Sequence, residues 1–226
     1  MTTSTGKADL ARLYAGSRAR VLALVTGLSE AGQAAPVPAC PAWSVRDVLA
    51  HLAAIAEDAQ AGLLTGPPDD AGTAAQVARF AGQDLARILA AWDCAAPAFG
   101  QLIASARLWP AVIDVASHEH DIRGALGVPG ARDSEAVTEC AGRLLRWLRP
   151  AVPLRVIVED GEFRVGPDDS GPRPCLTLTT TRFEAFRWRM GRRSRAQLAA
   201  LDWSGDPSPV LGQLTVFGPA ATDMIE

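Results

Sequence analysis

The spacing of apolar residues changes once along this chain, near residue 150, and that change limits its possible folds. Before it, apolar side chains recur every three or four residues, as amphipathic helices require. Beyond it, β-branched residues gather in short alternating runs. Pro150 and Pro153 lie at the change and disfavour a continuous helix. We therefore predict an α+β protein, with an all-α domain over 1–150 and a small α+β domain over 153–226.

The first part reads as helices joined by short loops, the pattern of an antiparallel four-helix bundle. Ser44 and Asp47 form a capping box that begins a helix over 45–64. Pro110 suits the first turn of a helix over 110–126, and Gly127 suits its end. The same spacing predicts further helices, with a break at Pro97, over residues 8–29, 73–92, 98–108 and 134–149.

The second part begins with two β-branched runs around a tight glycine turn, which predicts a hairpin over 154–166. Alternation predicts a third strand over 174–181. Helical patterns follow over 182–190 and within 191–206, and a short last helix is expected within 208–218.

Composition excludes several classes of protein. The 226 residues are 48% hydrophobic and 21% charged, a globular balance, and the net charge of −3 does not favour nucleic-acid binding.

No apolar run reaches the roughly 18 residues of a membrane span, and the polar start is unlike a signal peptide, so we expect a cytoplasmic protein. One lysine and no asparagine indicate GC-rich coding, typical of an actinobacterial source. The four cysteines are widely spaced and form neither a disulfide framework nor a zinc motif. We therefore expect most of them to be buried in the core as small hydrophobic side chains.

The three histidines are the most informative polar residues. Asp114 and His118 lie one turn apart on the helix over 110–126, so their side chains share a face. His51 lies on the inner face of the helix over 45–64. Facing helices of a bundle can bring His51, Asp114 and His118 together. Two imidazoles and a carboxylate hold a divalent metal and leave coordination positions open, as a catalytic site requires.

Two neighbours complete this stretch. Asp121 is three residues after His118, where it can accept from a histidine N–H or turn to solvent. His120 lies about 200° around the helix from His118, and we expect it in a surface or cleft position. The alternative to a metal site is also open at this point, because a histidine on an apolar face is often a satisfied core residue and an Asp-x-x-x-His pair is often a surface contact.

The stretches CPAWSVRDVLAHL (40–52) and DVASHEHDIRGALG (114–127) resemble the mycothiol-dependent maleylpyruvate isomerase family. That family has a DinB-like four-helix bundle and the patterns C-P-x-W-x-V-x-D-x-x-x-H-L and E-x-x-x-H-x-x-D-x-x-x-A-x-G. The tail GRRSRAQLAALDWSGD (191–206) resembles its C-terminal domain more weakly. The resemblance implies metal binding by His51, Asp114 and His118. This chain departs from the family by having Asp114 where glutamate is usual, which puts metal affinity and activity in question.

The resemblance also implies an enzyme with a divalent metal, zinc first, and a mycothiol-like thiol as partners. The thiol would attack a small electrophile, giving cis–trans isomerisation or S-transfer. A carboxylate-bearing substrate needs cations, and Arg192 and Arg193 are the candidates, against the alternative of a solvated basic face. Two other functions stay open: a non-catalytic binding or regulatory module that keeps the fold, and a carrier of apolar ligands in the second domain. The sequence does not decide the oligomeric state.

Overall fold

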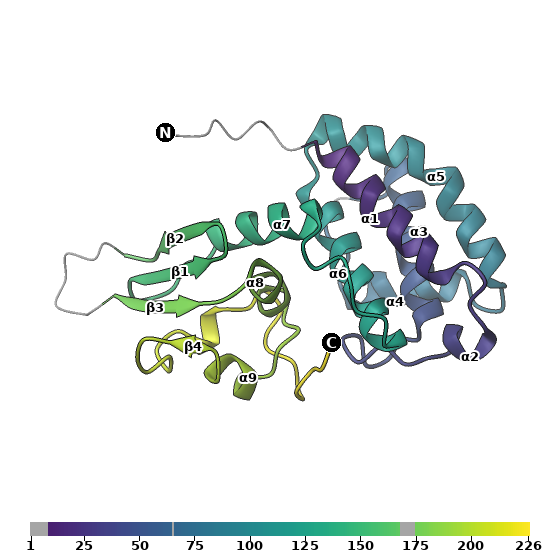
Figure 1. Cartoon of the computed structure of the whole chain (residues 1–226). Coiled ribbons are helices and arrows are strands. Elements are labelled where there is room, and N and C mark those ends of the chain that lie inside the picture. Colours follow the sequence, from purple (N-terminus) through teal and green to yellow (C-terminus); the bar gives the residue numbers. More distant parts are fainter. Residues whose placement is uncertain (1–8, 65, 168–174) are drawn as a thin grey trace. The chain divides into compact units, whose positions relative to one another are not determined.

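A computed structural model gives the structure of residues 9–64, 66–167 and 175–226 (Figure 1). The chain forms two compact units, Met1–Gly130 with Glu226, and Ala131–Ile225. The first unit is helical, and the second combines helices with a four-stranded sheet. The predicted α+β class is therefore confirmed.

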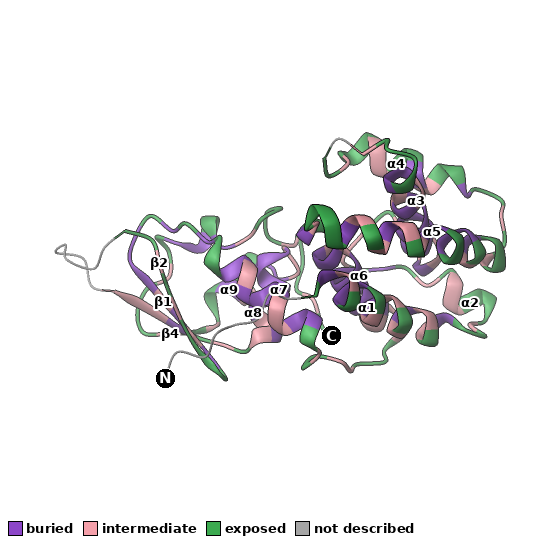
Figure 2. Ribbon diagram, turned by 90° about the horizontal axis from the view of Figure 1, so that it is seen from above, coloured by how far each residue is buried: buried purple, intermediate pink, exposed green. Residues whose placement is uncertain are grey.

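Four helices of the first unit pack as a bundle, as predicted. α1 contacts α5 and α6, and α3 contacts the same two helices, so each helix lies between two others. Figure 2 shows their buried faces turned inward and exposed residues along their outer sides. The bundle helices are α1 (Leu10–Val25), α3 (Val45–Gln60), α5 (Leu85–Ala106) and α6 (Trp109–Leu126).

Local signals set the ends of the helices that carry the candidate site. Ser44 and Asp47 form both hydrogen bonds of the capping box at the start of α3, as predicted. Pro110 lies in the first turn of α6, and Gly127 ends that helix with a φ of 64°, in the left-handed region that glycine adopts without strain. Both helices therefore begin or end where the sequence indicates.

The predicted helix break at Pro97 is wrong. The break lies earlier, between α4 (Asp70–Arg79) and α5, where Gly82 has a φ of 74° and Asp84 caps α5. Pro97 lies inside α5 on its exposed side, so the carbonyl that lacks a helical partner faces water. The predicted helix over 8–29 ends earlier, because α1 stops at Val25, and a separate short helix, α2 (Glu30–Gln33), follows it.

The second unit begins twenty residues before the predicted seam. α7 (Glu135–Arg146), which we had placed with the bundle, packs on α8 (Arg182–Arg189) and contributes Leu145 to the core of the second unit. That core also contains Val156 of the sheet and Trp188 of α8. The apolar face of α7 is therefore buried in the core of the second unit.

The sheet has the strand order β2-β1-β3-β4. β1 and β2 form the predicted antiparallel hairpin, and β3 runs parallel to β1. Pro174, the first residue of the predicted third strand, lies outside the described residues. The strands are β1 (Leu154–Val158), β2 (Gly161–Val165), β3 (Leu176–Thr179) and β4 (Asp202–Trp203). α9 (Arg195–Ala199) precedes β4, but the predicted last helix within 208–218 is only a 3₁₀ turn at Leu211–Gln213.

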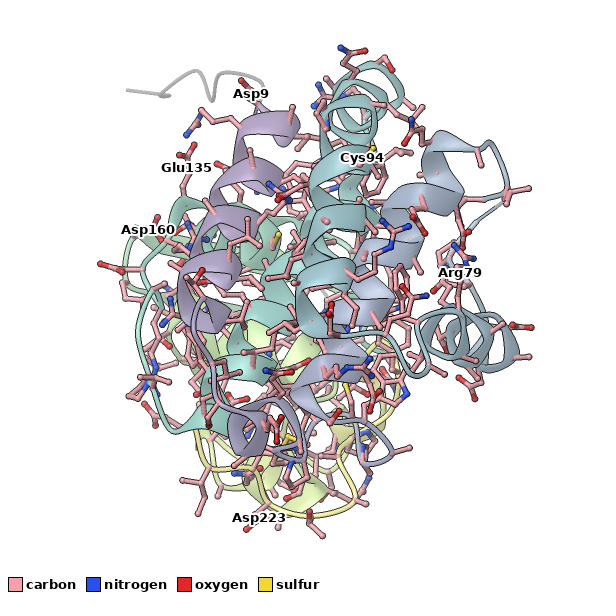
Figure 3. The ribbon with its side chains drawn as sticks, turned by 90° about the vertical axis from the view of Figure 1, so that its right-hand side faces the viewer. Asp9, Arg79, Cys94, Glu135, Asp160 and Asp223 are labelled. Atoms are coloured by element: carbon pink, nitrogen blue, oxygen red, sulfur yellow. The ribbon has the colours of Figure 1, made fainter. Side chains whose placement is uncertain are left out.

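Two further expectations are modified by the structure. All four cysteines are free thiols, but only Cys140 is buried, and Cys94 is exposed on α5, where Figure 3 labels it. Among the described residues, α5 alone is long and apolar enough to cross a membrane by length and composition. Its buried residues lie on the side that packs in the bundle, and a core helix passes the same test, so this is weak evidence for a span.

Candidate metal centre

α3 and α6 bring together the three residues that the sequence singled out. Asp114, His118 and Asp121 follow one another at four- and three-residue spacing, so they share one face of α6. His51 projects from α3, two turns after its capped start. The His51 and His118 rings meet edge to face with their centres 5.3 Å apart.

The carboxylate of Asp114 faces both imidazoles. Its Oδ2 lies 3.5 Å from Nε2 of His51, and its Oδ1 lies 3.4 Å from Nε2 of His118. One donor atom from each residue lies within 4.8 Å of the other two. The structure therefore presents two ring nitrogens and a carboxylate around one point, as the spacing predicted.

This arrangement fits a divalent metal. Bonds of about 2.1 Å in a tetrahedral site place neighbouring ligand atoms about 3.4 Å apart, close to the two N–O distances. Three protein donors leave at least one position for another ligand. The histidine side chains are 4% and 8% exposed, whereas that of Asp114 is 29% exposed, so the carboxylate is the part of the centre that meets solvent.

The other ring nitrogen of each histidine has a partner that orients the ring. Nδ1 of His118 lies 3.0 Å from Oδ2 of Asp121, so Asp121 takes the acceptor position that we had considered for it. Nδ1 of His51 lies 2.9 Å from Oε1 of Gln76, on α4. In each case the outer contact directs Nε2 toward the centre.

The residues that support the outer nitrogen of His51 were not predicted from the sequence. Nε2 of Gln76 donates to Oδ2 of Asp58 at 2.8 Å, and Nη2 of Arg79 donates to Oδ1 of Asp58 at 2.6 Å. Arg79 comes from the last turn of α4 and is labelled in Figure 3. Gln76 is 25 residues from His51 in a helix whose predicted start was misplaced, and no motif connects the two. Only the one-turn spacing of Gln76 and Arg79 could have indicated a shared polar face.

The proline-rich loop before α3 lines the same centre. Backbone hydrogen bonds from Val37 to Trp43 and from Trp43 to Cys40 close this loop. The Trp43 ring centre lies 5.3 Å from that of His51 and 6.3 Å from that of His118. Trp43, which we interpreted as packing before the helix cap, therefore also forms a wall of the site.

A second donor group overlaps the first on the loop side. Cys40 Sγ lies 4.0 Å from Oδ2 of Asp121, and Cys40, His118 and Asp121 also have donor atoms within 4.8 Å of one another. Because His118 and Asp121 already contact each other through Nδ1 and Oδ2, this group lies behind His118 rather than at the point that His51 faces.

The charges of the site reinforce one another. Burial by itself would raise the pKa of Asp114, but the adjacent His118 and His51 outweigh burial and lower that pKa far below its usual range. Burial would lower the pKa of His118, but the Asp114 charge and the contact with Asp121 raise it well above its usual value. Without a metal, the pair therefore favours an ionised Asp114 beside a protonated His118.

The sequence also singled out His120, Arg192 and Arg193. His120 is 3% exposed, so the expected surface or cleft position is wrong: α6 is buried on nearly all sides, including the side opposite the site. Arg192 and Arg193 belong to the second unit, between α8 and α9. Arg192 Nη1 donates to the carbonyl of Met190 at 2.7 Å, and Arg193 forms a two-pronged pair with Glu184 at 2.5 and 2.9 Å.

The bundle and its convergent donors define a helical-bundle protein with a candidate divalent-metal centre. The family model of the mycothiol maleylpyruvate isomerase N-terminal domain matches residues 14–137, more than half of the chain and all three donors. The chain belongs to this family. A crystal structure of the mycothiol-dependent maleylpyruvate isomerase, in a histidine-to-alanine mutant, shares its fold with a TM-score of 0.60. The two are 13% identical over 92% of this chain and 99% of the other. No curated protein matches the sequence.

Proposed function

We propose that this chain is a metal-dependent enzyme that uses a mycothiol-like thiol for cis–trans isomerisation or S-transfer on a small, carboxylate-bearing electrophile. Its family membership supports the thiol, and the neighbour's name supports the isomerase class. The observation that carries the proposal is the convergence of His51, Asp114 and His118 on one point with donor atoms within 4.8 Å.

His51, Asp114 and His118 would hold the metal, with zinc as the first candidate. When bound, a divalent metal with an open coordination position favours the thiolate form of a thiol, which is its nucleophilic form. Addition of the thiolate sulfur to a conjugated double bond gives an enolate in which the former double bond is a single bond that rotates, and elimination returns the thiolate with the isomerised product. Protonation of the enolate by solvent instead of elimination gives the S-transfer product.

The chain's own residues orient and shield this centre. Gln76 and Asp121 hold the two imidazole rings by their outer nitrogens. The Trp43 ring provides an apolar wall beside both imidazoles, with its centre 5.3 Å from that of His51 and 6.3 Å from that of His118. The partly exposed Asp114 leaves the approach for small molecules on its own side.

We retain Arg192 and Arg193 as proposed partners for a substrate carboxylate. Both arginines have protein partners, Met190 for Arg192 and Glu184 for Arg193, so a substrate carboxylate would compete with these contacts. A cytoplasmic location, where low-molecular-weight thiols stay reduced, is part of the same proposal.

A non-catalytic metal-binding or regulatory role is the second candidate. The observation that favours it is Asp114, which has a shorter side chain than the family's usual glutamate. The distances of 3.4 and 3.5 Å argue against a loss of reach, because the carboxylate still contacts both imidazoles. We therefore place catalysis first.

Elemental analysis of untagged protein, beside His51→Ala and His118→Ala, tests the metal centre. We expect near-stoichiometric metal in the unaltered protein and loss in both variants. Thiol-dependent isomerisation and S-conjugation of small unsaturated diacids then test the chemistry. Metal without any thiol-dependent turnover would favour the regulatory role, and a metal-free protein after incubation with zinc would refute both.

A further inference from the structure

We propose that Gln76 and Asp58 are positioning residues that fix the tautomer of His51, so that its Nε2 lone pair faces the metal centre. This inference rests on the proposed function, because it assigns a role toward the metal to residues that do not touch it. It also gives α4, which contributes no ligand, a part in the site.

The contacts form one continuous chain from the surface to the centre. Arg79 donates to Oδ1 of Asp58 at 2.6 Å, and Gln76 Nε2 donates to Oδ2 of Asp58 at 2.8 Å. Gln76 Oε1 then lies 2.9 Å from Nδ1 of His51. Gln76 is 3% exposed and Asp58 is 7% exposed, so water does not easily replace these partners.

The chemistry of each group fixes the direction of the chain. An ionised carboxylate only accepts hydrogen bonds, so Asp58 requires the NH₂ end of the Gln76 amide to face it. The carbonyl end of Gln76 must then face His51, and a carbonyl only accepts. Nδ1 of His51 therefore carries the proton, in opposition to the Asp114 carboxylate, which lies 3.5 Å from Nε2 and by itself would favour a proton there. Nε2 is left as a lone pair on the side of Asp114 and His118, as metal binding requires.

One substitution reverses every step. In Asp58→Asn, Arg79 can only donate, so it keeps the oxygen of the new amide on its own side. The NH₂ of that amide then faces Gln76, which must turn its carbonyl outward and its NH₂ toward His51. Nδ1 of His51 becomes the acceptor and the ring proton moves to Nε2, where it blocks the metal.

The test uses the full chain without metal and labels its three histidines with ¹⁵N. NMR at mildly alkaline pH distinguishes the two tautomers of His51, assigned by comparison with His51→Ala. We expect the Nδ1–H form in the unaltered protein and a shift to the Nε2–H form in Asp58→Asn. Titration with zinc alone should show roughly 10- to 100-fold weaker binding in that variant.

Two further variants separate positioning from packing. Glu57→Gln removes a neighbouring negative charge that also pairs with Arg79, without touching Gln76, and should leave the tautomer and zinc affinity unchanged. Gln76→Leu removes the amide that contacts Nδ1 of His51, so it tests the same fixing of the tautomer without changing Asp58. Gln101→Leu, the same substitution at an exposed position of α5, is the matched control. We expect Gln76→Leu to lose the single tautomer, and Gln101→Leu to keep it.

The outcomes distinguish a failure of the positioning role of Gln76 and Asp58 from a failure of the proposed metal-dependent function. A His51 that is already in the Nε2–H form, or that keeps its tautomer in both Asp58→Asn and Gln76→Leu, would overturn it and leave these residues a purely structural role. A tautomer shift in a protein that binds no metal would support the positioning of His51 and refute the proposed metal-dependent function.

Discussion

Asp114 and His118 lie one turn apart on α6, and Oδ1 of the carboxylate is 3.4 Å from Nε2 of the imidazole. The same carboxylate contacts His51 on α3 through its second oxygen. Asp114 is therefore the residue that joins the two histidines, although its side chain is one methylene shorter than the family's usual glutamate.

Replacing Asp114 by asparagine should abolish stoichiometric metal binding, with an affinity loss greater than the roughly 100-fold upper range for residues outside the ligand set. The amide keeps the shape but removes the negative charge that both imidazoles face. Zinc titration of metal-free protein measures the loss. Asp114→Glu should keep the metal, since the charge remains, and Asp93→Asn, an exposed acidic residue of α5, is the control. Unchanged zinc affinity in Asp114→Asn would contradict the assignment.

Zinc binding should release about one proton near neutral pH and should tighten as the pH rises. Asp114 raises the pKa of His118 well above its usual value, so the metal must displace a proton from that ring. Asp114 itself stays ionised, because its own pKa is lowered, and contributes nothing to this dependence. Calorimetry in buffers of different ionisation enthalpy counts the protons. A pH-independent affinity between about pH 6 and 8 would contradict this prediction.

The core of the bundle should lose stability at alkaline pH through Tyr14. Burial raises the pKa of Tyr14 to about 12, and its hydroxyl accepts from Nε1 of Trp92 at 2.7 Å. The unfolded phenol ionises near pH 10, so the folded state holds more protons than the unfolded state between about 10 and 12. Stability from this group is therefore complete below about pH 10 and declines above it.

Tyr14 is the only tyrosine, so tyrosinate absorbance follows this group alone. Tyr14→Phe should destabilise the protein by about 1–3 kcal/mol in denaturant unfolding at neutral pH, because Trp92 loses its acceptor in a buried position. The variant should also show a flatter decline of stability above about pH 10. Ionisation of Tyr14 in the folded protein near pH 10 would count against the prediction.

Alanine substitutions of Arg192 and Arg193 should distinguish an arginine that contacts the substrate from one that stabilises the fold. Arg193→Ala should destabilise the second unit by about 1–3 kcal/mol, since it removes a mostly buried partner of the half-exposed Glu184. Arg192→Ala, which removes a hydrogen bond to the carbonyl of Met190, should raise KM for a carboxylate substrate more than Arg193→Ala does. Thermal unfolding and steady-state kinetics of both variants provide the comparison. Equal effects of the two substitutions on KM would remove the distinction.

Much of the fold could be predicted because its signals are local. The Ser44 capping box and the Gly127 terminator lie within a few residues of the backbone groups that they satisfy. Pro97 misled the prediction, because a proline on the exposed side of a long helix loses little when water solvates the freed carbonyl. Assigning α7 to the correct unit required knowing which apolar surface it covers, and spacing along one helix does not give that.

The convergence of His51, Asp114 and His118 could be predicted because Asp114 and His118 are close in sequence and His51 lies on a well-capped helix. The support of His51 could not, because Gln76 comes from α4 and reaches His51 only through packing of α3 against α4. His120 was misplaced for a similar reason. Helix geometry gave its direction away from His118, but only the packing around α6 shows that this direction is also buried.

The two histidines are supported by different kinds of group, His118 by the carboxylate of Asp121 and His51 by the neutral amide of Gln76. A carboxylate strengthens the basicity of an imidazole more than an amide does, so the two imidazoles would differ in strength as metal ligands although their side chains are identical. If the proposed centre binds an ion, its bond to His51 should break first when the ion exchanges with solution. Substitutions in α3 and α4 would then adjust the lifetime of the bound ion without altering α6.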